Sequence, residues 1–181
     1  MLGQLADLGV ESIEQPIPAR CYREMAILCG RSPVPIALDE DLIGIHDPEE
    51  RRALLTHVRP RMLVLKPALC GGFSGAEDWI SAAEGEGIRW WVTSALESNV
   101  GLNALAQWTA SLGESTHTRA QGLGTGALYV GNTPSPLHFD GERLTSTPQA
   151  IPSHVGTHQG ASVSEAAEVS QLSLLSLEWR S

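Results

Sequence analysis

Four short apolar segments recur along the first half of the chain, and each ends in residues that can take part in chemistry. The segments occupy 10–14, 35–39, 62–66 and 90–94, and they end in Glu14, Asp39, Lys66 and the pair Thr93-Ser94. The intervals from 14 to 39, 39 to 66 and 66 to 93 are 25, 27 and 27 residues. Each interval is about the length of one strand and one helix, so the pattern predicts repeated βα units.

The polar segments between these strands have the caps and the spacing of helices. Asp47 is expected to cap one helix, with Pro48 at its first position. Ser74 has the same capping spacing for another helix that ends near Gly85, and apolar positions at helical spacing predict helices over 20–29 and 98–112. Strand–helix alternation of this kind favours an α/β fold with one parallel sheet covered by helices.

The remaining segments carry weaker signals. Residues 1–9 have the spacing of the last turns of a helix, and residues 137–144 have the pattern of a hairpin with an Asp-Gly turn. Beyond residue 144 the chain becomes rich in Ser, Thr, Pro, Gln and Gly. We therefore divide it into a folded part, 1–144, and a flexible tail, 145–181, in which the end of the tail fits a helix or a strand equally well.

Charge and composition exclude several classes of partner. The net charge of −9 disfavours nucleic acid and anionic membrane surfaces. No apolar stretch approaches the ~20 residues that cross a bilayer, and residues 1–7 lack the features of a signal peptide. The chain is therefore expected in the cytoplasm, with Cys21, Cys29 and Cys70 as reduced thiols.

The strand ends suggest a metal site with a lysine beside it. Active sites of (β/α)8 barrels lie at the carboxyl ends of the strands, and Mg²⁺ prefers carboxylate oxygens. A single acid at such a place is usually a surface side chain, and Lys66 alone could extend from the sheet end into water. Glu14, Asp39 and Lys66 at three matched ends favour a shared site.

Two later segments could hold a substrate. The hydroxyls of Thr93 and Ser94 could bind a carboxylate, and the glycine-rich run 122–126 could bring its backbone close to a ligand. The length of 181 residues is too short for a closed eight-stranded barrel of about 250 residues. The repeats thus form either a smaller open sheet or part of a larger protein.

At these residues the chain resembles a known family. The motifs Ser-Ile-Glu-Gln-Pro-Ile (12–17), Ile-Ala-Leu-Asp-Glu (36–40), Leu-Lys-Pro (65–67), Thr-Ser-Ala-Leu-Glu-Ser-Asn (93–99) and Gln-Gly-Leu-Gly-Thr-Gly (121–126) are similar to the C-terminal barrel of the enolase superfamily. Within its muconate-lactonising-type subgroup, the o-succinylbenzoate synthase family is the most similar. The resemblance covers residues 1–144 and implies a partial (β/α)8 TIM barrel, about strands 4–8, with the capping domain absent.

The resemblance also implies roles for the residues. Glu14 and Asp39 would be two of three carboxylates that bind Mg²⁺ (or Mn²⁺), and Lys66 would be a catalytic residue that steadies an enediolate by its charge. Residues that hold the small-molecule carboxylate substrate would be Thr93, Ser94, Gly122 and Leu123. The implied reaction is the loss of water from a cyclohexadiene carboxylate, which gives o-succinylbenzoate for menaquinone biosynthesis.

The chain departs from the family pattern in one respect. The family's first metal carboxylate and its Lys-x-Lys pair belong to earlier strands, whereas Lys66 is the only lysine here. We therefore expect an N-terminally truncated lyase that is inactive by itself and could form a homo-oligomer through its open sheet edges. The alternatives are a dipeptide epimerase, an N-acylamino-acid racemase, a muconate cycloisomerase, or a non-catalytic half-barrel.

Overall fold

Four parallel strands form the sheet that the apolar repeats predict. A computed structural model describes residues 2–113, 116, 119–139, 143–146 and 177–178. Its strands are β1 (Ile13–Glu14), β2 (Ile36–Leu38), β3 (Met62–Leu65) and β4 (Arg89–Val92), and they pair in that order. A parallel bridge between Thr93 and Gly122 adds one more position beside β4. The fold is thus α/β with a parallel sheet, as expected for part of a (β/α) barrel.

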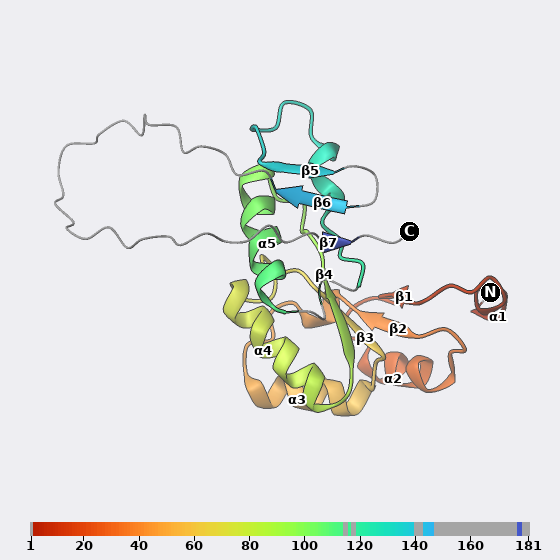
Figure 1. Ribbon diagram of the computed structural model, residues 1–181. Helices are drawn as coiled ribbons and strands as arrows, with labels where there is room; N and C mark the ends of the chain where they lie inside the picture. Colours follow the sequence, from red (N-terminus) through yellow and green to blue (C-terminus); the bar gives the residue numbers. More distant parts are fainter. Residues whose placement is uncertain (1, 114–115, 117–118, 140–142, 147–176, 179–181) are drawn as a thin grey trace.

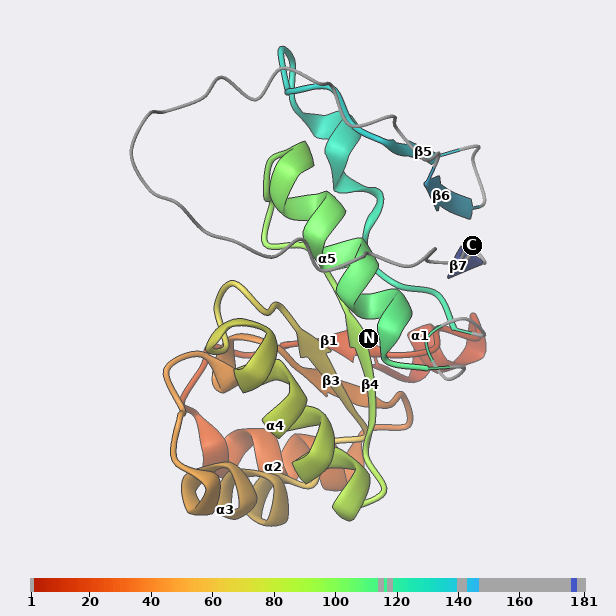
Figure 2. The same ribbon diagram turned by 60° about the vertical axis from the view of Figure 1, so that its left-hand side comes forward.

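Helices connect the strands and cover one side of the sheet. They are α1 (Leu2–Asp7), α2 (Tyr22–Arg31), α3 (Pro48–Val58), α4 (Gly72–Gly85) and α5 (Asn99–Ser111), with short 3₁₀ turns η1 (Glu40–Leu42) and η2 (Gly124–Leu128). Helices α2, α3 and α4 lie side by side beneath the strands (Figure 1), and the turned view shows the same layer (Figure 2). The predicted strand–helix alternation is therefore confirmed, with helix bounds shifted by one to three residues.

One predicted helix cap is confirmed and another is wrong. The Asp47 carboxylate accepts hydrogen bonds from the backbone N–H groups of Glu49 and Glu50, at 2.9 and 3.0 Å. Ser74, in contrast, lies inside α4, which begins at Gly72 with Gly71 as its N-cap. Gly71 and Gly72 have φ values of +97° and +75°, so the chain turns into the helix before it reaches Ser74.

The two faces of the sheet are built from alternating residues of the same strands. On the helix-side face, Leu63 and Leu65 of β3 join a large core with Met25, Leu55 and Trp79 of the helices. On the opposite side, which we call the inner face, Ala37, Met62 and Val64 form a small cluster with Trp91. Successive side chains of a strand point to opposite faces, so a residue's parity in the strand decides which cluster it joins.

The C-terminal part forms a second, antiparallel sheet. Strand β5 (Leu137–Phe139) pairs with β6 (Arg143–Ser146), and β7 (Leu177–Glu178) pairs with the other edge of β6. The predicted hairpin is confirmed, although its Asp-Gly turn lies outside the described residues. Most of the predicted tail, residues 147–176 and 179–181, also lies outside them.

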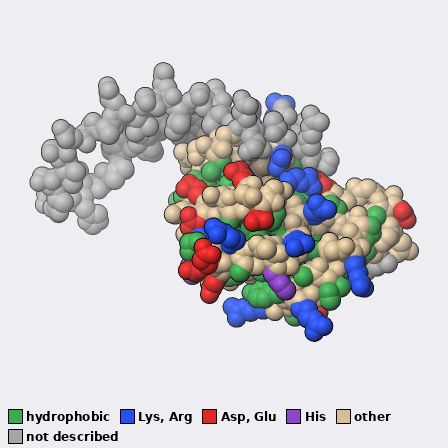
Figure 3. Space-filling view, turned by 90° about the horizontal axis from the view of Figure 1, so that it is seen from below, with side chains coloured by type: hydrophobic (Ala, Val, Ile, Leu, Met, Phe, Trp, Pro, Cys, Tyr) green, Lys and Arg blue, Asp and Glu red, His purple; other side chains and the backbone are tan. Residues whose placement is uncertain are grey.

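Two surface properties bear on the expected partners. Within the described residues, no helix combines the length and the apolar character that a membrane crossing needs. The face in Figure 3 carries basic side chains at several places, and most of its acidic side chains lie toward the left of the view.

Candidate active site

Glu14, Asp39 and Lys66 meet at one end of the parallel sheet. The Lys66 Nζ donates a hydrogen bond to Asp39 Oδ2 and lies 3.6 Å from Glu14 Oε1. The three residues end or follow β1, β2 and β3, so a single ammonium group joins carboxylates from two neighbouring strands. We refer to these three side chains as the Glu14–Asp39–Lys66 cluster.

Strand register explains why these side chains converge. Glu14 pairs with Ala37 across β1 and β2, and paired residues of parallel strands point to the same face. Asp39 lies two residues beyond Ala37, and Lys66 lies two residues beyond Val64. All three therefore continue the inner face past the point where its apolar cluster ends.

The cluster runs from a buried carboxylate to an open one. The exposed fractions of the side chains are 3% for Asp39, 21% for Lys66 and 46% for Glu14. Burial acts to lower the pKa of Lys66, but the hydrogen bond to Asp39 and the charges of Asp39, Glu14 and Glu40 outweigh it, so that pKa is raised. Lys66 therefore remains an ammonium ion at neutral pH.

The pKa of Glu14 is raised as well. The largest cause is burial, followed by the hydrogen bond with Asp39 and the negative charge of Asp39, while Lys66 partly offsets them. Two carboxylates in contact thus share one positive charge. Such a site holds spare negative charge that a second cation could balance.

The donor atoms of the cluster fit a divalent cation. Mg²⁺ is commonly held by one or two carboxylates together with water and substrate oxygens, and Glu14 and Asp39 supply two carboxylates from adjacent strand ends. Among the described residues, no group of three or more His, Cys, Asp or Glu side chains forms a complete metal site. Within the described part of the chain, Glu14 and Asp39 are thus the candidate ligands.

Two residues that the sequence did not single out support the cluster. Gln15 hydrogen-bonds the backbone of Asp39 and the side chain of Asp41, across 24 and 26 residues of sequence. Both Gln15 and Asp41 lie within two residues of a predicted ligand in the chain. Proximity to Glu14 and Asp39 was the only available signal, because a contact of this length leaves no local pattern.

Thr93 lies beside the cluster, and Gly122 packs against Thr93. The Thr93 N–H donates to Leu65 O at 2.9 Å, so Thr93 follows β4 next to the end of β3. Its hydroxyl donates to Gly122 O at 3.1 Å. A Cβ atom at Gly122 would lie 2.2 Å from Thr93 Oγ1, so only glycine fits this approach. Leu123 has its side chain in the core.

The side chain of Ser94 is hydrogen-bonded to Glu97 in the same loop. Its hydroxyl bonds the Glu97 carboxylate and accepts the Leu96 N–H at 2.9 Å, while the same carboxylate accepts the Ala95 N–H at 2.9 Å. The Ser-x-x-Glu spacing of 94–97 could have predicted this turn. The roles of Thr93, Ser94, Gly122 and Leu123 toward a substrate remain predictions.

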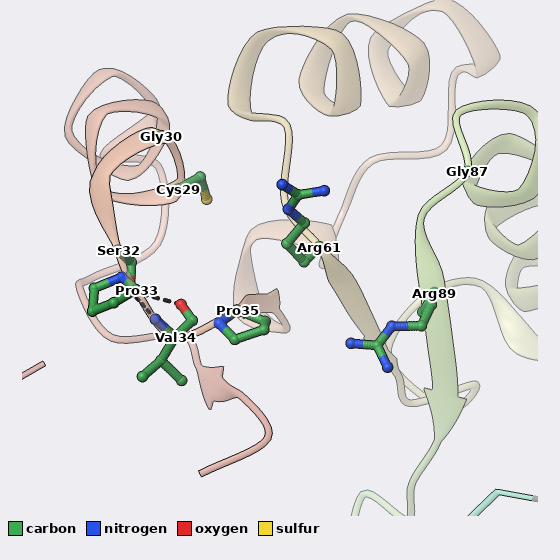
Figure 4. Close-up of a pocket in the computed structure, with 9 residues that line it drawn as sticks. All are labelled: Cys29, Gly30, Ser32, Pro33, Val34, Pro35, Arg61, Gly87 and Arg89. Carbon is green, nitrogen blue, oxygen red and sulfur yellow. Dashed lines mark hydrogen bonds between the residues drawn. The ribbon is translucent and has the colours of Figure 1, made fainter. Parts of the chain in front are cut away.

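The opposite end of the strands has a different character. A cavity of about 520 Å³ opens there, lined by residues that precede or begin β2, β3 and β4, including Arg61 and Arg89. Figure 4 shows the guanidinium groups of Arg61, just before β3, and of Arg89, at the start of β4, at separate places. Arg89 is already paired with Glu11 at 3.5 Å. The carboxylates and the ammonium of the cluster are absent from this lining.

Comparison with known proteins identifies relatives of this chain. Residues 1–149 match the family model described as enolase C-terminal domain-like. The chain is 52% identical over 143 residues to the o-succinylbenzoate synthase of Desulfotalea psychrophila, an alignment that covers 79% of this chain and 38% of that protein. The chain thus spans well under half the length of that relative.

Solved structures give the same result. The crystal structure of MenC from Desulfotalea psychrophila matches with a TM-score of 0.72 and 52% identity, over 77% of this chain and 38% of that one. Muconate cycloisomerase from Pseudomonas fluorescens matches with a TM-score of 0.60 and 27% identity, over 74% of this chain and 35% of that one. Both matches extend over most of this chain and about a third of the matched protein.

Proposed function

The chain belongs to the enolase C-terminal domain-like family, and from this premise we propose that it acts as the C-terminal part of an o-succinylbenzoate synthase. The observation that carries the proposal is the Glu14–Asp39–Lys66 cluster at three successive strand ends. The 52% identity to the Desulfotalea psychrophila synthase supports this activity over the others known in the superfamily.

We propose that Glu14 and Asp39 hold Mg²⁺ or Mn²⁺ and that Lys66 is a catalytic residue. When bound, the ion supplies positive charge beside the substrate carboxylate. Lys66 stays protonated because its carboxylate neighbours raise its pKa, so it stabilises negative charge that develops on the substrate when a proton is removed. This assignment gives Lys66 an electrostatic role and leaves proton removal to another group.

The proposed substrate is a small cyclohexadiene carboxylate that loses water to give o-succinylbenzoate. Thr93, Ser94 and the backbone at Gly122 and Leu123 form the proposed binding wall on the β4 side of the cluster. Because Lys66 is the only lysine of the 181 residues, we propose that these residues alone lack a general base and do not turn over substrate. The cytoplasm and menaquinone synthesis are the proposed setting.

A chimera tests this function. Residues 1–144 would replace the matching part of the Desulfotalea psychrophila synthase, and dehydration would be followed by the formation of o-succinylbenzoate. We expect a folded, active chimera, in which Lys66→Met lowers kcat by about 10²- to 10³-fold, the cost of losing one group that stabilises developing charge. Arg61→Met, at the opposite end of the strands, is the matched control and should keep full activity.

Other outcomes distinguish the alternatives. A folded chimera that epimerises dipeptides, racemises N-acylamino acids or cycloisomerises muconate, but does not dehydrate, would assign the chain to that activity instead. A folded chimera with no activity and no Mn²⁺-dependent thermal shift would favour the non-catalytic half-barrel. Dehydration at an enzymatic rate by the 181-residue chain alone would disprove the proposed lack of a base.

A further inference from the structure

We propose that Gln15 is a positioning residue that holds Asp39 in place for Lys66 and for the metal ion; this inference rests on the proposed function. Gln15 follows Glu14 at the end of β1, and Asp39 follows the end of β2. Its side chain bridges the two strand ends, and the geometry of that bridge points to its role.

The backbone of Gln15 is strained in a way that needs compensation. Its φ is +36°, in the region that favours glycine, and it precedes Pro16, a position that is normally extended. Its N–H still donates to Ala37 O at 2.9 Å, as a continuation of the β1–β2 ladder. A residue held in such a conformation persists only where its surroundings fix it, and such residues cluster at functional sites.

The side-chain amide of Gln15 both accepts and donates hydrogen bonds. Its Oε1 accepts the backbone N–H groups of Asp39 at 3.0 Å and Asp41 at 3.4 Å. Its Nε2 donates to Asp41 Oδ2 at 3.0 Å and to Ile17 O at 3.1 Å. A glutamate could accept the first two bonds but could not donate the others. The site therefore requires an acceptor and a donor on one side chain.

Asp41 extends this bridge to a third segment. Its carboxylate is buried, and its second oxygen, Oδ1, accepts the N–H of Arg20 at 2.5 Å. Among the described residues, the hydrogen bonds to this carboxylate come from the Gln15 amide and the Arg20 backbone. The loop that begins at Asp39 is consequently tied to β1 by Gln15 and to the segment before α2 by Asp41.

The bridge sets the geometry of the cluster. Asp39 has φ −128° and ψ −83°, outside regular strand or helix values, and its backbone N–H is the one that Gln15 accepts. Release of that bond would free Asp39 to turn its carboxylate away from Lys66. Since Gln15 adjoins Glu14, the same side chain relates the two proposed metal carboxylates to each other.

The single lysine allows a direct measurement of this role. The full 181-residue chain, labelled with ¹⁵N-lysine, gives one side-chain ammonium signal in NMR, that of Lys66. We expect a sharp signal in the wild type, because the ammonium protons are held by Asp39. Gln15→Ala and Gln15→Glu should broaden it through faster exchange with water. Mn²⁺ affinity, measured without substrate, should fall about tenfold, as for residues that orient metal ligands.

A paired exchange separates positioning from general destabilisation. Gln15→Glu combined with Asp41→Asn reverses donor and acceptor across the 3.0 Å bond, and the amide oxygen introduced by Asp41→Asn can still accept the Arg20 N–H. Relative to Gln15→Glu, we expect this double variant to recover part of the sharp signal and of the Mn²⁺ affinity, because the bond across to position 41 is restored while the bond to Ile17 O is not. Gln121→Ala is the matched control, because it removes a buried amide that accepts the Val92 N–H at 2.8 Å and should leave both readouts unchanged.

The outcomes are decisive. An unchanged ammonium signal in Gln15→Ala and Gln15→Glu, no recovery in the double variant, or equal broadening in Gln121→Ala would overturn the proposal. A wild-type chain whose Lys66 signal is sharp but which binds no Mn²⁺ would count against the proposed function. In that case the ammonium signal of the variants would still decide the role of Gln15.

Discussion

The two faces of the parallel sheet differ although they alternate along the same strands. Leu63 and Leu65 of β3 pack under the helices in a large core, whereas Met62 and Val64 belong to a small cluster that leads directly to Lys66. The helix-side face is apolar to its end, and the inner face becomes ionisable where the strands stop. Stability thus depends mainly on one face, and the proposed chemistry on the end of the other.

The largest expected loss of stability comes from a substitution in the helix-side face. Leu63→Ala should lower the free energy of unfolding by about 3–4 kcal/mol, because it leaves a cavity in the large core. Met62→Ala, the neighbouring inner-face residue of similar size, should cost about half as much, since its cluster has few members. Denaturant unfolding of both variants checks the difference, and equal losses would show that the faces contribute alike.

The next largest loss of stability is expected from a substitution at the charged end of the inner face. Lys66→Met leaves Glu14 and Asp39 in contact without their cation, and we expect a loss of about 2–3 kcal/mol at pH 8, below the range for a fully buried pair because the site is partly exposed. Lys66→Arg retains the charge and is the control. Thermal unfolding at several pH values is the measurement.

The pH dependence of that loss has a definite sign. Without Lys66, burial and Asp39 raise the pKa of Glu14 further above its ordinary value of 4.5. A carboxyl whose pKa is raised in the folded state makes the protein less stable as the pH rises through that pKa. The variant should therefore approach the wild type below pH 4.5. The difference in unfolding free energy between the wild type and the variant should narrow again above pH 10.5, because the wild-type Lys66, whose pKa is raised, then loses its proton. A gap independent of pH would contradict the electrostatic account.

A thiol under the helix-side face tests how tightly that face is closed. Burial raises the pKa of Cys70 to about 11, against 9.0 in the unfolded chain, so the reactive thiolate is about 100-fold scarcer at pH 8. Iodoacetamide labelling, followed by mass spectrometry, should modify Cys70 at least that much more slowly in the native chain than in denaturant. Equal rates in the two states would show an open core.

The smallest effect concerns a helix end that belongs only to the outer layer. Asp47→Ala removes the two capping bonds of α3 and should cost about 1 kcal/mol. Arg52→Ala breaks only an exposed pair with Glu49 and should change stability by less than about 0.5 kcal/mol. Neither variant should alter the Lys66 ammonium signal, and a change in it would link this helix end to the inner face.

The parts of the molecule that the sequence could predict are those with short-range signals. Regular spacing of Glu14, Asp39 and Lys66 after apolar strands sufficed to predict one parallel sheet and a common cluster. The prediction of Ser74 as a helix cap was wrong because the chain turns into the helix earlier, at Gly71 and Gly72, which have positive φ values. The Ser-x-x-Glu spacing could have predicted the Ser94–Glu97 turn, and the substrate role of Ser94 stays a prediction.

The support of the cluster could not be predicted in the same way. Gln15 bonds Asp39 and Asp41 only because β1 and β2 are neighbours in the folded sheet, and no nearby residue indicates these partners. Its positive φ before a proline contradicts local preference. Such a conflict between local preference and the observed backbone is expected at functional sites, where tertiary contacts compensate.

Zero-length carbodiimide coupling of the native chain tests the central claim most directly, because Lys66 is the only lysine that can react. The reagent joins an amine to a carboxylate in contact with it, and digestion with mass spectrometry identifies the joined peptides. The account predicts isopeptide bonds from Lys66 to Asp39 and Glu14, which disappear in denaturant. Coupling of Lys66 exclusively to other carboxylates in the folded chain would contradict it.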